Sequence, residues 1–204
     1  SISRMPAPKL NRAALDSWMA TVRSQRIGEP AAVNIVRAIE GACIANSFAE
    51  GVLIETQNMA PLVRSPEAFA LRHLFFAERA FLRGGTSAAP VQRLIDALPG
   101  CRPTPSISVG ASEADIERLL FPVAQDAVQL LATSPVGTSA DDIDVAYTQG
   151  SGFPRYLGGP LWWASRLGLE RLRVGLQKQG VAVVPVLADA TTLADVHKLA
   201  APKL

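Results

Sequence analysis

Apolar residues recur every three to four positions through most of the chain, which is the period of an α-helix. The period begins after Asn11, a residue type that caps helix N-termini, and Gly28-Glu29-Pro30 interrupts it. It resumes in two further stretches before residue 65. We therefore expect three amphipathic helices here: from Asn11 to about Arg26, from Val33 to about Asn46, and from about Ala49 to Leu62, the last kinked or frayed by Pro61.

A fourth helix is expected to begin at Ser65-Pro66-Glu67. This tripeptide combines a capping hydroxyl, a proline suited to the first turn, and an acid at the positive end of the helix dipole. Leu71, Leu74 and Phe75 share one side of that helix, and the pattern continues to about Arg83. Residues 10–83 are thus expected to be helical throughout.

The composition changes at residue 84. Residues 84–111 are rich in glycine, proline and serine, which is typical of a linker. One short helix, from Val91 to Leu98, is expected within it. The sequence therefore predicts two helical modules, residues 1–83 and 112–204, on either side of this linker.

The second module is expected to open with two helices. Ser112-Glu113 begins the first, whose apolar stripe continues to Leu131 and whose axis should bend at Pro122. Ser139-Ala140-Asp141-Asp142 resembles a capping box, in which the serine and the second aspartate would cap each other's backbone. The helix that follows this box should end at about Tyr147.

A run of glycine and proline between residues 150 and 160 predicts a tightly specified turn. Glycine accepts backbone angles that other residues resist, and proline fixes φ and removes a donor. The run could cradle a phosphate, but it lacks the Gly-Lys-Ser/Thr of a phosphate loop, so we interpret it as a structural turn. The residues assigned to this turn are Gly152, Phe153, Pro154, Gly158, Gly159 and Pro160.

Two helices are expected after the turn, from Leu161 to Leu167 and from Leu169 to Gln179, with Gly180 as the cap of the second. The run from Val181 to Val186 is the only strand-like one, and a proline interrupts it. A last short helix should run from Thr192 to Leu199. The sequence as a whole predicts an all-α fold.

Two segments of the chain resemble one enzyme family. The pattern Gly-x-Gly-Phe-Pro-x-x-x-Gly-Gly-Pro at residues 150–160, followed by an aromatic pair, an alanine and Gly168-Leu169, resembles the last domain of the multifunctional fatty-acid β-oxidation enzymes. These enzymes join an enoyl-CoA hydratase (crotonase) part to a 3-hydroxyacyl-CoA dehydrogenase part. The run from Ser65 to Arg79 is similar to the family's connecting helix, and the stretch from Glu50 to Glu55 resembles the crotonase tail.

The resemblance implies a division into three regions. Residues 1–83 would be the crotonase tail and connecting helix, residues 84–111 a linker, and residues 112–204 the C-terminal helical domain of the dehydrogenase. The family's NAD-binding Rossmann domain would fall at the linker, yet no Gly-x-Gly-x-x-Gly follows a strand anywhere in the sequence. In the family the terminal domain packs against a preceding helical domain, which is also missing here.

The sequence therefore predicts no catalytic residue, no metal site and no cofactor in this chain. The family uses NAD and coenzyme A thioesters, but its hydratase glutamates and its dehydrogenase His–Glu pair lie in parts that would precede residue 1 or fall at the linker. We interpret His73 and His197 as packed or solvated histidines rather than general bases. The acids Asp141, Asp142 and Asp144 are interpreted as helix caps rather than metal ligands.

The helix that ends near Arg83 carries the best candidate contacts for an acyl-CoA. The guanidinium groups of Arg79 and Arg83 could meet phosphates, and Phe76 could stack on adenine or line an acyl tunnel. The alternative is an ordinary amphipathic helix with solvated arginines.

Charge and composition exclude several kinds of partner. The net charge is +2, so there is no electrostatic footprint for nucleic acid or an anionic membrane. No apolar run approaches the ~20 residues of a membrane span. Cys43 and Cys101 have no metal-ligand spacing and are expected to be ordinary thiols in a reducing compartment. We expect a cytoplasmic location, with the peroxisomal matrix as the alternative because the last three residues differ by one from the Ser-Lys-Leu address.

These expectations favour a non-catalytic helical scaffold or assembly part of a β-oxidation multifunctional enzyme. Two alternatives stay open: an acyl-CoA-binding module, and a reduced family member that is active only within a larger complex. The expected partners are accordingly an acyl-CoA, a second copy of the chain, or another β-oxidation subunit.

Overall fold

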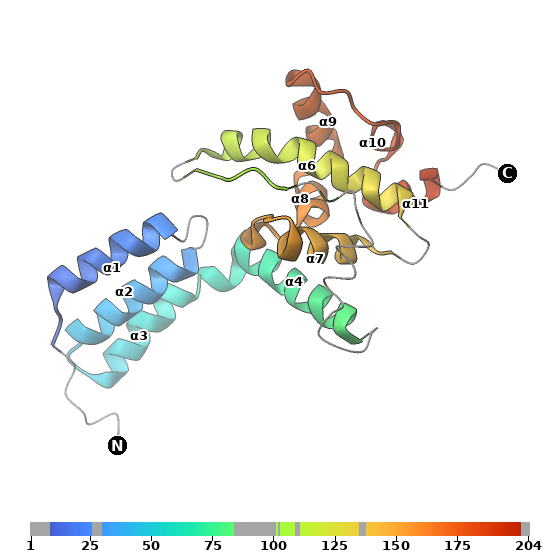
Figure 1. Cartoon of the computed structure of the whole chain (residues 1–204). Coiled ribbons are helices and arrows are strands. Elements are labelled where there is room, and N and C mark those ends of the chain that lie inside the picture. Colours follow the sequence, from blue (N-terminus) through green and yellow to red (C-terminus); the bar gives the residue numbers. More distant parts are fainter. Residues whose placement is uncertain are drawn as a thin grey trace. The chain divides into compact units, whose positions relative to one another are not determined.

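The computed structural model in Figure 1 describes residues 9–25, 30–83, 101, 103–108, 111–134 and 138–200. Within these ranges the chain forms helices and no strand, so the expected all-α class is confirmed. The short helix expected at residues 91–98 lies outside the described residues. The α-helices are α1 (Arg12–Gln25), α2 (Pro30–Ile44), α3 (Phe48–Met59), α4 (Pro66–Arg83), α6 (Glu113–Thr133), α7 (Ala140–Gly150), α8 (Pro160–Leu167), α9 (Leu169–Lys178), α10 (Pro185–Asp189) and α11 (Leu193–Ala200).

The chain divides into two compact units, residues 1–69 and residues 70–204. The boundary falls inside α4, so residues 70–83 of that helix belong to the C-terminal unit. The three-region division drawn from the family resemblance, with a boundary at residue 83, stays a prediction.

The N-terminal unit contains α1, α2 and α3, in which α2 packs against both of the other helices. Ser47 caps α3 by accepting a hydrogen bond from the backbone N–H of Glu50, as a helix-opening serine should. The helix ends at Met59, just before Pro61, and a short 3₁₀ turn follows at Leu62–Arg64. In this unit about half of the described large apolar side chains are exposed and most of the others are partly buried, so that Val36 is the only one of them that is buried.

Helix α4 begins as the sequence predicts. The hydroxyl of Ser65 accepts a hydrogen bond from the backbone N–H of Ala68 at 3.2 Å, and Pro66 occupies the first turn, where its missing N–H costs nothing. The buried residues of α4 are Ala70, Leu74 and Ala77, which recur at helical spacing on one face. This face is therefore the one that packs into the C-terminal unit.

Helices α7 to α11 gather around α6 in the C-terminal unit (Figure 1). A capping box opens α6, because the hydroxyl of Ser112 accepts from the N–H of Asp115 while the Asp115 carboxylate accepts from the N–H of Ser112. The helix continues through Pro122 and buries eight residues, among them Leu120, Phe121 and Leu131. The core of the unit is built on this helix.

The strand-like run at residues 181–186 does not form a strand. Pro185 instead opens α10, a position that suits a residue with fixed φ and no N–H. The side chain of Gln125 replaces a strand partner: its Nε2 donates to the carbonyl of Ala182 at 3.0 Å, and its Oε1 accepts from the N–H of Val184 at 3.1 Å. A buried amide on α6 therefore satisfies the backbone groups that a neighbouring strand would have paired.

Candidate functional site

The Gly/Pro run connects α7 to α8 through backbone conformations that favour glycine. Gly152, Gly158 and Gly159 have φ values of +73°, +82° and +100°. Phe153 is buried between them, and its N–H donates to the carbonyl of Tyr147 at 3.1 Å. A 3₁₀ turn, Arg155–Leu157, follows Pro154, and Pro160 is the first residue of α8. Of the residues assigned to a turn from the sequence, Gly152, Phe153, Pro154, Gly158 and Gly159 lie in this connection, whereas Pro160 is already part of α8.

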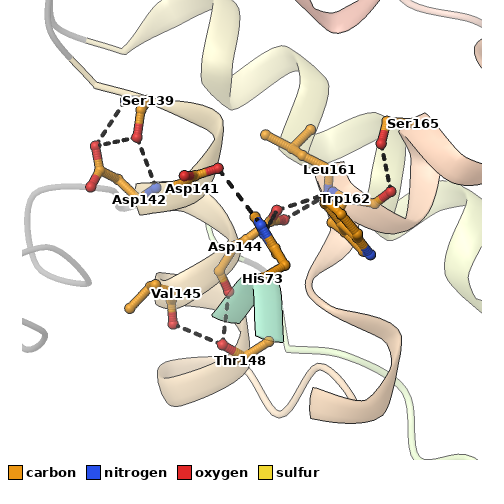
Figure 2. Close-up of polar contacts among 10 residues, drawn as sticks. All are labelled: His73, Ser139, Asp141, Asp142, Asp144, Val145, Thr148, Leu161, Trp162 and Ser165. Carbon is orange, nitrogen blue, oxygen red and sulfur yellow. Dashed lines mark hydrogen bonds and ion pairs between the residues drawn. The ribbon is translucent and has the colours of Figure 1, made fainter. Parts of the chain in front are cut away.

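Asp144 is the polar centre of this region. Its side chain is only 1% exposed, and its carboxylate extends from α7 to the N-terminus of α8. The N–H of Leu161 donates to Oδ1 at 2.8 Å, and the N–H of Trp162 donates to Oδ2 at 3.0 Å (Figure 2). Gly159, the N-cap residue just before α8, has no side chain to act as a cap. Asp144 therefore supplies from another helix the cap that the α8 sequence lacks.

The third partner of Asp144 is His73 of α4. Nε2 of His73 lies 3.0 Å from Oδ2 of Asp144, and the imidazole stacks on the indole of Trp162 with ring centroids 4.3 Å apart. On the other side of the ring, Nδ1 lies 4.0 Å from a carboxylate oxygen of Asp141, whose side chain is 57% exposed. Figure 2 shows the imidazole between the two carboxylates. The His73 side chain is itself only 10% exposed, so the pair with Asp144 is shielded from water.

Burial sets the ionisation of Asp144. Removal from water disfavours the charged form and raises the pKa of Asp144 to about 6, although the hydrogen bonds from His73, Leu161 and Trp162 act in the opposite direction. A carboxyl with that pKa exchanges its proton at only mildly acidic pH. The site therefore holds a buried group that is able to titrate.

A second polar contact joins α4 to the region of the turn. Oε1 of Glu78 accepts from Arg155 at 2.7 Å and from the side-chain amide of Gln149 at 2.6 Å. Partial burial opposes ionisation of Glu78, but these two hydrogen bonds outweigh it, and the pKa of Glu78 is lowered. The inner face of α4 is thus tied to α7 and the turn at two places five residues apart.

The residues proposed to contact an acyl-CoA lie on the exposed side of α4. Phe76 is 62% exposed, and its ring meets the ring of Phe75 edge to face. The guanidinium carbon of Arg79 lies 4.3 Å from the centroid of the Phe75 ring, and Nε of Arg83 donates to the carbonyl of Arg79 at 3.2 Å. The structure thus separates the candidate residues into two groups, the turn around Asp144 and this exposed aromatic and cationic side of α4.

Sequence reasoning missed the pairing of His73 with Asp144. Of the three neighbouring acids, Asp142 completes the expected capping box with Ser139, whereas Asp144 caps α8 rather than its own helix. His73 was expected to be packed or solvated, and it is packed, against Trp162. A signal existed, because Gly159-Pro160 starts a helix with no capping side chain and so requires an acceptor from elsewhere. His197 lies in α11.

Within the described ranges, no helix combines the length and the apolar character needed to cross a membrane.

Comparisons with known proteins find enzymes of fatty acid β-oxidation that are similar to part of the chain. The peroxisomal bifunctional enzyme of Danio rerio is 47% identical over 57 residues, which are 28% of this chain and 8% of the relative. The glyoxysomal fatty acid beta-oxidation multifunctional protein of Brassica napus is 29% identical over 103 residues, or 50% of this chain and 14% of the relative. The peroxisomal fatty acid beta-oxidation multifunctional protein of Arabidopsis thaliana is 36% identical over 87 residues, which are 43% of this chain and 11% of the relative.

The similarity is partial in both directions, because the matches span 8 to 14% of the length of these three relatives. No protein-family model and no solved structure matches the chain. The relatives nevertheless agree with the family that the glycine-rich turn and the segment around α4 resemble. Over the segment that it shares with them, the chain is similar to the multifunctional enzymes of fatty acid β-oxidation, and this similarity supports that family.

Proposed function

We propose that the chain is a non-catalytic helical assembly part of a fatty acid β-oxidation multifunctional enzyme. Similarity to peroxisomal bifunctional and multifunctional enzymes supports a role in fatty acid β-oxidation. It also favours a location in the peroxisomal matrix over the cytoplasm. The polar groups at the best-formed site, His73 and Asp144, are engaged with each other and with the start of α8, which supports a structural role for them.

The observation that carries this proposal is how few apolar side chains the N-terminal unit buries. A three-helix unit is stabilised by apolar side chains that face one another, yet about half of the described large ones here are exposed, and Val36 alone is buried. Exposed apolar residues of α2 and α3 recur at helical spacing, so that they form faces: Ile35 and Ile39 on α2, and Phe48 and Val52 on α3. Burying one such side chain contributes roughly 1.5–3 kcal/mol. Faces of this kind favour burial against a partner.

We assign that partner to the remainder of a β-oxidation multifunctional enzyme, whether on the same polypeptide or on another. In the relatives, the segment similar to this chain is a small share of a much longer protein, so most of each relative is available to pack against it. A second copy of the chain is the competing occupant. The mass of the complex distinguishes a second copy of the chain from the remainder of a multifunctional enzyme.

The purified chain is expected to show no turnover of its own. Hydration of crotonyl-CoA and NAD-linked oxidation of 3-hydroxybutyryl-CoA should both stay at the rate of the blank, with an intact multifunctional enzyme as positive control. Turnover that is proportional to the concentration of the chain would show that it is an enzyme. Turnover that appears only when other β-oxidation subunits are added would instead support the alternative of a reduced family member active within a larger complex.

An acyl-CoA-binding module is the second candidate, favoured by the exposed side of α4. Phe76 and the stacked pair of Phe75 and Arg79 present aromatic and cationic groups to solvent, the two chemistries that an adenine ring and a phosphate require. Arg83, one turn further on, would add a second cation.

If α4 binds acyl-CoA, Arg79→Ala is expected to weaken binding about tenfold, because one charge-assisted contact of roughly 1.4 kcal/mol is lost. Calorimetric titration with a long-chain acyl-CoA measures the affinity, and titration with NADH should show no binding. Arg118→Ala serves as the matched control, since it removes an exposed arginine from α6. Equal losses in both variants would indicate general charge attraction rather than a site on α4.

A further inference from the structure

We propose that copies of this chain associate with one another, the exposed side of α3 on one copy packing against the exposed side of α4 on the next. The α3 face consists of Phe48, Val52, Leu53 and Glu55, and the α4 face consists of Phe75, Phe76, Arg79, Leu82 and Arg83. The inference goes beyond the proposed function and does not rest on it, because a second copy competes with the multifunctional enzyme for the α3 face.

The exposed apolar side chains of the C-terminal unit are concentrated on α4. Among the described residues of this unit, the large apolar ones that are exposed are Leu71, Phe75, Phe76 and Leu82 of α4 and Val174 of α9. The opposite side of α4 is fixed on α7 and the turn through His73 and Glu78, so the helix cannot rotate to bury its exposed side. An apolar patch of this kind favours burial against a partner.

Aromatic and arginine side chains, which are enriched at the centres of protein interfaces, make up most of the α4 face. The Phe76 side chain is 62% exposed, and the guanidinium carbon of Arg79 lies 4.3 Å from the centroid of the Phe75 ring. Nε of Arg83 donates to the carbonyl of Arg79 at 3.2 Å. These contacts hold the two arginines in place before a partner arrives, which lowers the entropy lost on binding.

The charge of the α4 face is positive. Arg79 and Arg83 are both exposed, whereas the carboxylate of Glu78 is turned toward α7 and the turn, where it accepts from Gln149 and Arg155. Two α4 faces packed on each other would bring their arginines together, and like charges across an interface cost free energy. The α4 face therefore requires a partner surface that is apolar and that also carries a carboxylate.

The α3 face has this chemistry. Phe48 and Val52 are 57% and 45% exposed, and Glu55 follows Val52 by three residues, so the three lie along one side of the helix. Both charged residues of α3, Glu50 and Glu55, are acidic. Glu50 accepts from the N–H of Asn46 at 2.7 Å, which leaves Glu55 as the exposed charge beside the apolar residues. Two α3 faces would repel each other, whereas an α3 face and an α4 face are complementary.

Each copy of the chain carries one α3 face and one α4 face. The contact between two copies therefore joins different surfaces, and repetition of it builds a ring, an open chain, or a dimer in which the contact is made twice. In each of these assemblies, loss of one face on a copy can be compensated only by a copy on which that face is intact.

Two variants of the full chain, studied alone and as a mixture, test the contact. Val52→Lys places a cation on the α3 face opposite the arginines of α4, and Phe76→Ser removes the most exposed ring of the α4 face. In sedimentation velocity each variant alone is expected to associate at least about tenfold more weakly than the wild type. An equimolar mixture should form a dimer of the two variants, because the α4 face of the Val52→Lys chain meets the α3 face of the Phe76→Ser chain.

Matched controls separate the contact from general effects of charge and apolar surface. Gln57→Lys adds the same cation at an exposed polar position of α3, and Val174→Ser shortens an exposed apolar side chain of α9. Both should associate like the wild type. All four substituted positions are exposed, and circular dichroism checks that each variant keeps the helicity of the wild type.

Three results would refute the proposal: a wild-type chain that stays monomeric up to its highest soluble concentration, association that only one of the two variants weakens, or a mixture no more associated than its components. The assay contains no multifunctional enzyme, so a negative result leaves the proposed function unaffected. Failure of the chain to bind that enzyme would count against the proposed function alone.

Discussion

Gly159→Ala is expected to destabilise the C-terminal unit by about 2–5 kcal/mol, the sum of backbone strain and steric overlap. Gly159 has a φ of +100°, which an alanine adopts only at a cost. Its added Cβ would also overlap the side chain of Asp144, which cannot move away without giving up its hydrogen bonds to α8. Chemical denaturation of the wild type and the variant measures the loss.

Gly152→Ala is the matched control for this substitution. Gly152 also has a positive φ, of +73°, but an added Cβ would meet nothing within 4 Å. Only the backbone cost remains, about 1 kcal/mol. If both variants lose the same unfolding free energy, then the side chain of Asp144 does not exclude a Cβ at residue 159, and the steric part of the prediction is wrong.

Leu172→Ala is expected to cost about 2–5 kcal/mol. Leu172 is fully buried on α9, in the core that forms around α6, and its truncation leaves a cavity that the surrounding helices fill only in part. The same denaturation experiment measures the loss. Val174→Ala on the same helix should cost less than 1 kcal/mol, because Val174 is 37% exposed. A loss at Val174 as large as that at Leu172 would contradict the orientation of α9.

The parts of the fold that depend on neighbouring residues could be predicted from the sequence. Apart from α10, which was not predicted, apolar spacing located the helices of the described residues to within a few positions, and the capping box at Ser139 and Asp142 forms as expected. Gly180 ends α9 as predicted, with the N–H of Val181 donating to the carbonyl of Leu176. Each of these features is decided by side chains within one or two helical turns.

The parts that depend on distant residues could not be predicted. Residues 181–186 have the apolar character of a strand, but their backbone partners come from Gln125 on another helix. The pairing of His73 with Asp144 likewise joins residues that nothing in the local pattern relates. Asp144 lies among capping acids and was given the same role as its neighbours, although its own side chain is buried and caps α8. Tertiary packing, rather than propensity, decides such contacts.

The resemblance to the β-oxidation multifunctional enzymes could be seen in the sequence alone. It rests on the unusual order of glycines, prolines and aromatics at residues 150–160 and on the run from Ser65 to Arg79. Similarity of parts of the chain to several β-oxidation enzymes supports the same family. Apolar spacing alone did not reveal how few apolar side chains the N-terminal unit buries, because the pattern of an amphipathic helix is the same whether its apolar face meets its own unit or a partner.

Sedimentation velocity of the fluorescently labelled full chain, with and without the β-oxidation multifunctional enzyme of the same organism, tests the assembly role most directly. We predict that the chain co-sediments with the enzyme and that Val52→Glu, which places a charge on the exposed apolar face of α3, abolishes the complex. Gln57→Glu, which adds the same side chain at an exposed polar position of α3, should leave it intact. A chain that sediments alone in the presence of the enzyme, or a complex unaffected by Val52→Glu, would contradict the assembly role.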